Sequence, residues 1–213
     1  MQQSLLYKIK VLNLRFHNRN MMSDIGFYFG LGWKHIISTD ALDHQLFILA
    51  LTSVYTFKNS KQVLVLVTAF TIGHSLTLAL SVLDLLRFPG KWVEFLIPCT
   101  IFITALNNLW RVNQKDGSIH VNYWLALFFG LIHGMGFANT IRIMLAKDQS
   151  IGWGLLGFNL GLEAGQIIVV GLILILAYVF MNFLKITRRD WVFFISAAIF
   201  ALSVQMALER LPF

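Results

Sequence analysis

The sequence has a single cysteine, Cys99, and few charged residues. One thiol can form neither a disulfide within the chain nor a metal site built from several thiolates. Charged residues make up 13% of the 213 positions, about half the share of an ordinary soluble domain. This scarcity of charge argues against a soluble protein and directs attention to the apolar residues.

Two further patterns are absent, and each excludes a class of function. The chain has no G-x-x-x-x-G-K-[ST] segment, the loop that cradles ATP phosphates, so it is no ATPase of that type. Its net charge of +7 lies between the apolar runs and not in a basic patch interleaved with stacking aromatic residues. We therefore expect no nucleic-acid partner.

Apolar residues, 57% of the chain, concentrate in runs near the ~20 residues that a membrane-spanning helix needs. We predict an all-α integral membrane protein, a bundle of about six transmembrane helices in one domain over residues 40–208. The expected spans are 40–57, 62–83, 92–111, 122–145, 152–181 and 190–208. The loops between them are short, so we expect no soluble domain.

Two segments precede the first predicted span. Residues 1–22 form a basic leader that lacks the uninterrupted apolar region of a signal peptide, and translation from Met21 or Met22 would remove it. Residues 23–39 are too short and too interrupted to span, so an interfacial amphipathic helix is expected there. Without the leader, basic residues divide seven to six between the two sides. The side of the N-terminus stays open, with an outside location slightly preferred.

Ionisable residues inside the apolar runs are the most informative part of the chain. Asp43 and His44 adjoin at the beginning of the first span, and Asp40 lies on the same helix face. An ionised side chain at mid-bilayer costs roughly 2.5–3.5 kcal/mol on insertion scales, so such residues are expected to have a function. The structural alternative is a capping aspartate at a hydrated helix start.

Two more histidines lie near the middle of their spans. His74 belongs to the second span, and His133 lies between Gly130 and Gly134 in the fourth. That glycine pair lets a neighbouring backbone approach closely. Each imidazole could simply hydrogen-bond across the bundle. Together with the carboxylates, however, they offer the ligand chemistry of a borderline divalent metal such as nickel, zinc or iron.

The fifth span separates small from polar residues. Glycines recur every fourth position and define a packing face: Gly157, Gly161 and Gly165. Asn159, Glu163 and Gln166 fall roughly opposite, at about 100° per residue. Glu163 is expected either to balance the charge of an ion or to be a protonated, hydrogen-bonded side chain that can carry a proton.

Four segments, taken in order, resemble the HupE/UreJ family of bacterial membrane proteins. They are GWKHII…DALDHQLF (32–47), TAFTIGHSLTLA (68–79), FGLIHGMGFA (129–138) and GFNLGLEAGQ (157–166). The resemblance covers about residues 25–180 and implies a six-helix permease-like protein that acquires nickel or cobalt for hydrogenase or urease. The family's signature positions are occupied here by His35, Asp43, His44, His74, His133 and Glu163. His35 stands nine residues before His44, a longer gap than in better-known members, which indicates a divergent branch.

We therefore predict a multi-pass permease of the bacterial cytoplasmic (inner) membrane, carrying nickel or cobalt, with zinc as a further substrate to consider. The metal-site candidates are His44, Asp43, His74, His133 and Glu163, with Asp40, His35 and Asn159 as additional candidates. The ion is the substrate, so no tightly bound cofactor is expected. The expected partners are the lipid bilayer and the ion, and homo-oligomerisation stays open.

Two other classes of function are kept as alternatives. A membrane-embedded zinc hydrolase would activate water on a resident metal and would retain that metal through mild chelation. An accessory subunit of a membrane complex would tolerate histidine substitutions without any change in metal traffic.

Overall fold

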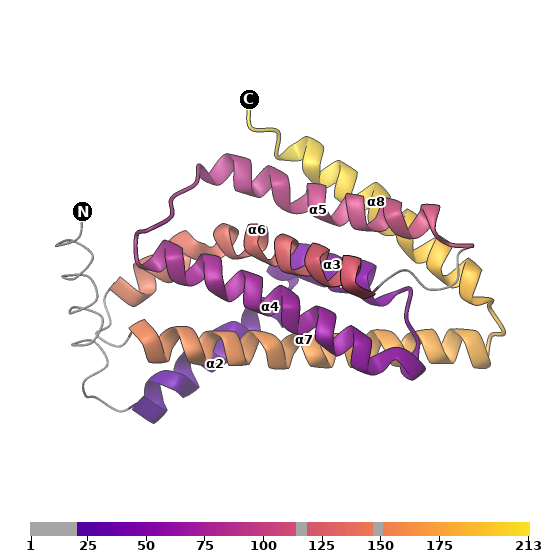
Figure 1. The fold of residues 1–213 in the computed structure, drawn as a ribbon, viewed down its shortest axis with the longest axis horizontal. Helices are drawn as coiled ribbons and strands as arrows, with labels where there is room; N and C mark the ends of the chain where they lie inside the picture. The colour runs from indigo at the N-terminus through magenta and orange to yellow at the C-terminus, as the bar shows by residue number, and fades with distance from the viewer. Residues whose placement is uncertain (1–20, 114–118, 147–150) are drawn as a thin grey trace.

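The computed structural model describes residues 21–113, 119–146 and 151–213, so most of the expected basic leader lies outside the described residues. Every regular element within these ranges is helical, and the chain is an all-α membrane protein (Figure 1). The elements are α2 (Met21–Ile37), η1 (Thr39–Ala41), α3 (Leu42–Thr52), η2 (Phe57–Asn59), α4 (Ser60–Val82), α5 (Gly90–Trp110), α6 (Ile119–Ala146), α7 (Ile151–Asn182) and α8 (Arg188–Glu209).

Four stretches of the described chain are long and apolar enough to cross a membrane: Phe57–Val82, Gly90–Trp110, Gly152–Asn182 and Arg188–Glu209. The helices α4, α5, α7 and α8 begin and end within two residues of the second, third, fifth and sixth predicted spans. The fourth predicted span falls within α6, whose 28 residues extend for about 42 Å at the rise of an α-helix.

The first predicted span, residues 40–57, differs from the structure. Its helix α3 has only 11 residues, or about 16 Å, roughly half of the ~30 Å hydrocarbon core of a bilayer. The preceding α2, which corresponds to the expected interfacial helix, ends at Ile37, and residues 38–41 separate the two helices. Ser38, Thr39 and Asp40 lie in this break, where short polar side chains favour turns over a continuous helix.

A side chain from α3 stabilises the break. The Gln45 amide nitrogen donates hydrogen bonds to the carbonyl oxygens of Ile36 and Ser38, each at 3.0 Å. Carbonyls at the C-terminal end of a helix have no partner within that helix. Gln45 therefore links both carbonyls to α3 across the break, although the Ser38 carbonyl also accepts a hydrogen bond from the Ala41 N–H at 3.0 Å.

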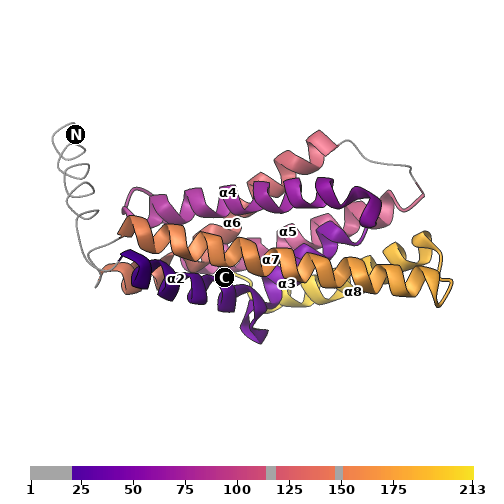
Figure 2. The same cartoon turned by 90° about the horizontal axis from the view of Figure 1, so that it is seen from below.

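The glycine face predicted for the fifth span packs against α2, as expected (Figures 1 and 2). A Cβ atom added to Gly161 would lie 2.0 Å from the Phe29 carbonyl oxygen, and one added to Gly157 would lie 2.6 Å from that of Ile25. Only glycine permits this approach of two backbones. Because Ile25 lies opposite Gly157 and Phe29 opposite Gly161, α2 and α7 run in the same direction.

The predicted Gly130–Gly134 pair likewise brings α6 against α4. A Cβ atom at Gly130 would lie 2.2 Å from the carbonyl oxygen of Phe70, and one at Gly134 would lie 2.3 Å from that of His74. The close approach of these helices carries the middle of α6 up to the middle of α4. It therefore sets the distance between the two histidines that the helices carry.

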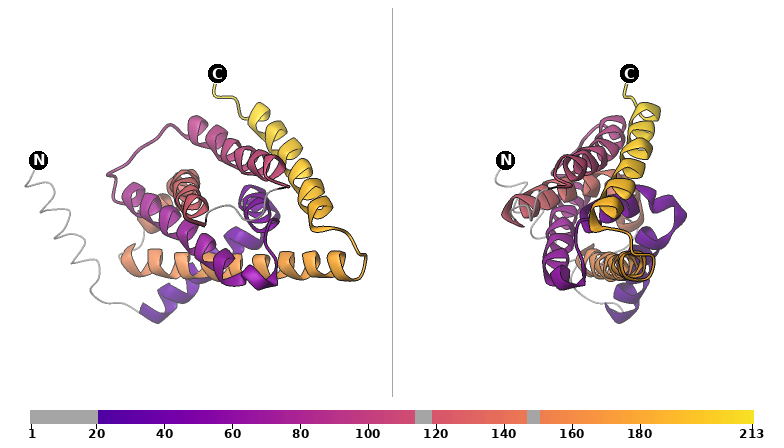
Figure 3. Two further views of the ribbon diagram at one scale, coloured as in Figure 1. Left: turned by 45° about the vertical axis from the view of Figure 1, so that its right-hand side comes forward. Right: turned by 90° about the vertical axis from the view of Figure 1, so that its right-hand side faces the viewer.

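The short helix α3 lies inside the bundle. Figure 3 shows it between α7 on one side and the antiparallel pair α5 and α8 on the other. Most of its residues are buried, and the Asn108 side chain of α5 donates a hydrogen bond to the Ala50 carbonyl of α3 at 2.7 Å. The interior position of α3 brings its first turn, with His44, to the centre of the protein.

Candidate metal centre

Four helices each bring one histidine to the interior. His35 lies in the last turn of α2, His44 in the first turn of α3, and His74 and His133 lie near the middle of α4 and α6. His44, His74 and His133 are buried, and His35 is half-buried. The break between α2 and α3 lets His35 and His44, which come from two different helices, meet at one point.

Three of these histidines form a group that could hold one ion. His35, His44 and His74 each offer a ring nitrogen, and the three nitrogens lie within 4.8 Å of one another. Two nitrogens bound at about 2.1 Å to the same ion are at most about 4.2 Å apart. A movement of the rings by about 1 Å would therefore bring all three onto an ion.

His133 lies directly beside this three-histidine group. Its ring centroid is 5.1 Å from that of His44, and its Nε2 atom is 3.0 Å from the Thr100 hydroxyl of α5. The sequence left open whether the candidate residues form one cluster or a path; in the structure His44 lies beside both His74 and His133, while Glu163 is not part of the three-histidine group. His133 is held by a hydrogen bond at the edge of the group.

The imidazoles carry many polar atoms that lack a partner. Five buried ring nitrogens make no hydrogen bond to the described residues: His35 Nε2, His44 Nε2, both nitrogens of His74, and His133 Nδ1. Buried polar groups without partners are uncommon and costly in proteins. Lone pairs and N–H groups that converge in this way fit a site that a ligand completes.

Phenylalanines enclose the imidazoles. The Phe137 ring centroid is 4.1 Å from that of His35, and the Phe158 ring stacks on His74 at 6.4 Å. Phe70 and Phe47 contact His133, with centroid distances of 5.1 and 5.2 Å. These rings give the imidazoles largely apolar surroundings, in which electrostatic interactions are stronger than in water.

The side chain of Asp43, unlike that of its neighbour His44, is paired with an arginine. Its Oδ2 atom accepts a hydrogen bond from Arg210 Nη1 at 2.9 Å, forming an ion pair between α3 and the end of α8. The other oxygen, Oδ1, is buried and has no partner among the described residues. Asp40 lies in η1, and its side chain is outside what the structure describes.

The polar residues of α7 contact α4. Glu163 Oε1 accepts a hydrogen bond from the Thr68 hydroxyl at 2.8 Å, and the buried Gln166 accepts one from Thr71 at 2.7 Å. Glu163 does not belong to the three-histidine group. The Oδ1 atom of Asn159 is buried without a partner among the described residues.

The sequence thus identified the histidines as candidates but did not identify several residues around them. Arg210 is 167 positions from Asp43, and no local pattern links the two. Gln45 could have been noticed, because it is a polar residue directly after His44 within an apolar run. The phenylalanine shell had a partial signal in Phe70, which stands four residues before His74 and contacts His133.

Comparison with known proteins agrees with the motifs. A family model described as HupE / UreJ protein matches residues 12–210, which is nearly the whole chain. No curated protein and no solved structure matches the chain.

Proposed function

The chain belongs to the HupE/UreJ family, and from this premise we propose that it is a permease for a divalent transition metal, with nickel or cobalt as the first choice. The resemblance of its motifs to that family suggests the two metals. The observation that carries the proposal is the set of five buried imidazole nitrogens without partners around the three-histidine group. Imidazole is a good ligand for nickel, cobalt and zinc.

We propose six membrane crossings in the bacterial inner membrane, the first of them discontinuous. In this arrangement α2 and α3 together make one crossing, and α4, α5, α6, α7 and α8 make one each. Two features support it: α2 runs in the same direction as α7, and α3 alone is too short to span. Transporters commonly bind their ions where such a helix is interrupted.

The proposed ligands are suited to an ion that must dissociate from the site after it has bound. Among the described residues the three-histidine group contains no carboxylate, so neutral imidazoles would hold the cation without a full countercharge. His133, beside His44, would offer the ion the next imidazole on its path through the protein. A membrane potential of 100 mV contributes about 4.6 kcal/mol to moving a doubly charged ion across the whole bilayer. Glu163 would act outside the group, by balancing charge or carrying a proton.

Uptake of nickel and cobalt by intact cells tests the proposal. Cells expressing His44→Ala or His74→Ala are expected to accumulate at least about tenfold less metal than the wild type, because each substitution removes a ligand. Ile72→Ala is the matched control, since Ile72 is exposed on the same helix as His74. Equal accumulation by the histidine variants, at equal amounts of folded protein, would refute the permease role.

Metal analysis of the purified protein separates the permease from the hydrolase. A permease is expected to release its ion during mild chelation, whereas a hydrolase would keep a stoichiometric zinc ion. The hydroxyl of Ser75, the nearest serine in sequence to His74, donates a hydrogen bond to the Thr71 carbonyl of its own helix at 2.6 Å. An accessory subunit would leave metal uptake unchanged in all histidine variants.

A further inference from the structure

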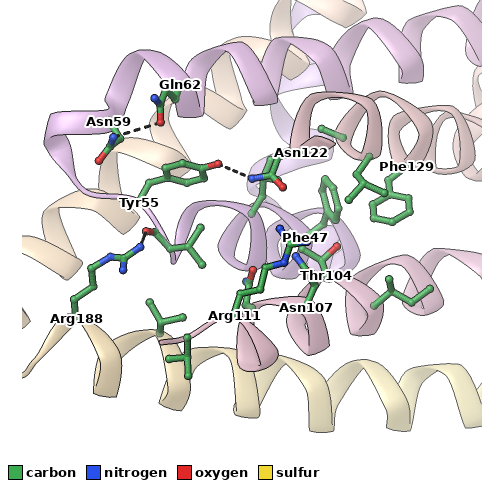
Figure 4. Close-up of a pocket in the computed structure, with 18 residues that line it drawn as sticks. Phe47, Tyr55, Asn59, Gln62, Thr104, Asn107, Arg111, Asn122, Phe129 and Arg188 are labelled. Atoms are coloured by element: carbon green, nitrogen blue, oxygen red, sulfur yellow. Dashed lines mark hydrogen bonds between the residues drawn. The ribbon is translucent and has the colours of Figure 1, made fainter. Parts of the chain in front are cut away.

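A second polar site lies at one end of the bundle, apart from the histidines. It is a cavity of about 310 Å³ between α3 and the segment that follows it, the C-terminal part of α5, the N-terminal part of α6, and the first turns of α4 and α8 (Figure 4). This volume lies at the lower end of the range for small-molecule pockets, about 300–1,000 Å³. The cavity is therefore large enough for a small organic ion or a headgroup.

Among the described residues that line this cavity, the charged side chains are all positive. Two arginines line it, Arg111 at the end of α5 and Arg188 at the start of α8. The 18 lining residues include no aspartate, glutamate or histidine. Five side-chain amides also line the cavity: Asn59, Gln62, Asn107, Asn108 and Asn122. Asn59, Asn108 and Asn122 each donate one hydrogen bond within the protein, to Gln62, Ala50 and Tyr55, which uses one of the two N–H donors of each amide.

The two arginines keep free hydrogen-bond donors. Arg188 Nη2 donates to the Val54 carbonyl at 2.7 Å, which uses one of the five N–H donors of a guanidinium. Arg111 forms no hydrogen bond or ion pair with the described residues. By contrast, Arg210 and Arg87 each have a carboxylate within 3 Å. The arginines of the cavity thus differ from those that already have an anionic partner.

Aromatic rings separate the cavity from the metal centre. Phe47 and Phe129 line the cavity, and Phe47 also contacts His133, with ring centroids 5.2 Å apart. None of the four histidines lines the cavity. The lining also includes Val54, Val112 and Val192, so a ligand would meet aliphatic carbon as well as cations and amides.

We propose that this cavity binds a small oxyanion, whose carboxylate or phosphate group is held by Arg111 and Arg188 and oriented by the amides. The planar guanidinium fork matches the two oxygens of such a group. The oxyanion could come from two sources with the same chemistry: a free carboxylate or phosphate in water, or the headgroup phosphate of an anionic lipid. The proposal does not depend on metal transport.

Binding measurements on the full-length protein in neutral detergent, free of metal, test this. Isothermal titration uses citrate and inorganic phosphate as probes, and native mass spectrometry compares retained phosphatidylglycerol with phosphatidylcholine. We expect saturable binding of at least one probe, weakened about tenfold or more by Arg111→Gln or Arg188→Gln. Lys91→Gln is the matched control, because it removes one positive charge from an exposed position outside the cavity.

The outcomes separate the two sources and leave the proposal falsifiable. Binding of citrate or phosphate that the arginine variants lose supports a free oxyanion, and selective retention of phosphatidylglycerol that the same variants lose supports a lipid. Arg111→Lys keeps the charge but not the fork and is expected to lose part of the affinity. The proposal is overturned if no probe binds, or if Lys91→Gln weakens binding as much as the arginine variants do. An unchanged Tm of Arg111→Gln in detergent verifies its fold.

Discussion

A buried imidazole without a hydrogen-bond partner has lost its contact with water and gained nothing in return. His74 is the extreme case, since it is fully buried and neither ring nitrogen has a partner among the described residues. His35, which the longer gap before His44 set apart in the sequence, lies in the same group. His35 and His74, each with a buried ring nitrogen that has no partner among the described residues, therefore differ from Glu163, whose carboxylate accepts a hydrogen bond from Thr68.

Substitution of His35 therefore tests the group directly. We expect His35→Ala to lower the nickel affinity of the purified protein by at least about tenfold, as His44→Ala does, because each loses one imidazole ligand. Glu163→Gln is expected to keep the affinity within about threefold, well below the tenfold loss expected for a ligand. Isothermal titration with nickel measures all three. An equal loss for Glu163→Gln and His35→Ala would contradict the assignment.

The Asp43–Arg210 pair provides a prediction about stability. The two side chains are 19% and 32% exposed, so solvent screens the pair only in part. Arg210→Gln leaves a mostly buried carboxylate without its cation and is expected to lower the free energy of unfolding by about 1–2 kcal/mol. Thermal unfolding in detergent measures this effect as a lower Tm.

The matched variants identify its cause. Asp43→Asn combined with Arg210→Gln should recover part of the lost stability, because no unpaired charge remains. Arg87→Gln breaks an exposed pair with Asp84 and should leave the Tm unchanged. If the double variant is no more stable than Arg210→Gln, the loss does not come from the unpaired carboxylate.

At the scale of elements, two glycine contacts hold the parts of the metal centre at their distances. The α2–α7 contact positions His35, and the α4–α6 contact positions His74 relative to His133. The α2–α7 contact at Gly157 and Gly161 involves no residue of the group, whereas the α4–α6 contact includes the backbone of His74. A small change in helix separation should therefore alter metal binding from a distance.

Gly161→Ala tests the α2–α7 contact. The new methyl group would lie 2.0 Å from the Phe29 carbonyl oxygen, so the helices must separate, at an expected cost of about 1–3 kcal/mol in stability. Because α2 carries His35, nickel affinity should fall as well. Tm and nickel titration measure both effects.

Gly171→Ala is the control on the same helix. A Cβ atom there has nothing within 4 Å, and alanine favours a helix over glycine. Its stability and nickel affinity should equal or exceed those of the wild type. A Gly161→Ala protein with unchanged Tm and affinity would show that α2 is not held by this contact.

At the scale of the whole molecule, the loops that lie at each end of the bundle predict the membrane topology. Asn59, Arg111 and Arg188 line one cavity, so the loops after α3, α5 and α7 gather at one end. The helix α4 leads away from this end to Arg87, in the loop before α5. The two loop sets should therefore face opposite sides of the membrane.

Single cysteines labelled from outside intact cells test that arrangement. In a Cys99→Ser background, Lys61→Cys and Lys185→Cys should share one accessibility and Arg87→Cys should show the other. Lys61, Lys185 and Arg87 are all exposed, so a thiol at each should react wherever the reagent reaches it. Labelling of Arg87→Cys together with Lys61→Cys would contradict an odd number of crossings between them.

The sequence alone predicted the helices that consist of one continuous apolar run. Runs of apolar residues predicted α4, α5, α7 and α8 to within two residues, and the spacing of Gly157, Gly161 and Gly165 predicted a packing face. The first span was wrong in length, because α3 ends at Thr52 and residues 53–56 separate it from η2. The interruption at residues 38–41 coincides with the predicted boundary between residues 39 and 40, but apolarity gave no sign of the hydrogen bonds by which Gln45 bridges it.

Membrane setting, family and the identity of the histidines were thus determined by the sequence itself, because composition and motif spacing are local properties of the chain. Only the tertiary structure decided which candidates meet. It brought His35 to His44 and His74, paired Asp43 with Arg210 and joined Glu163 to Thr68. The physical reason is that helix separation and direction, set by glycine contacts between distant segments, determine which side chains face each other.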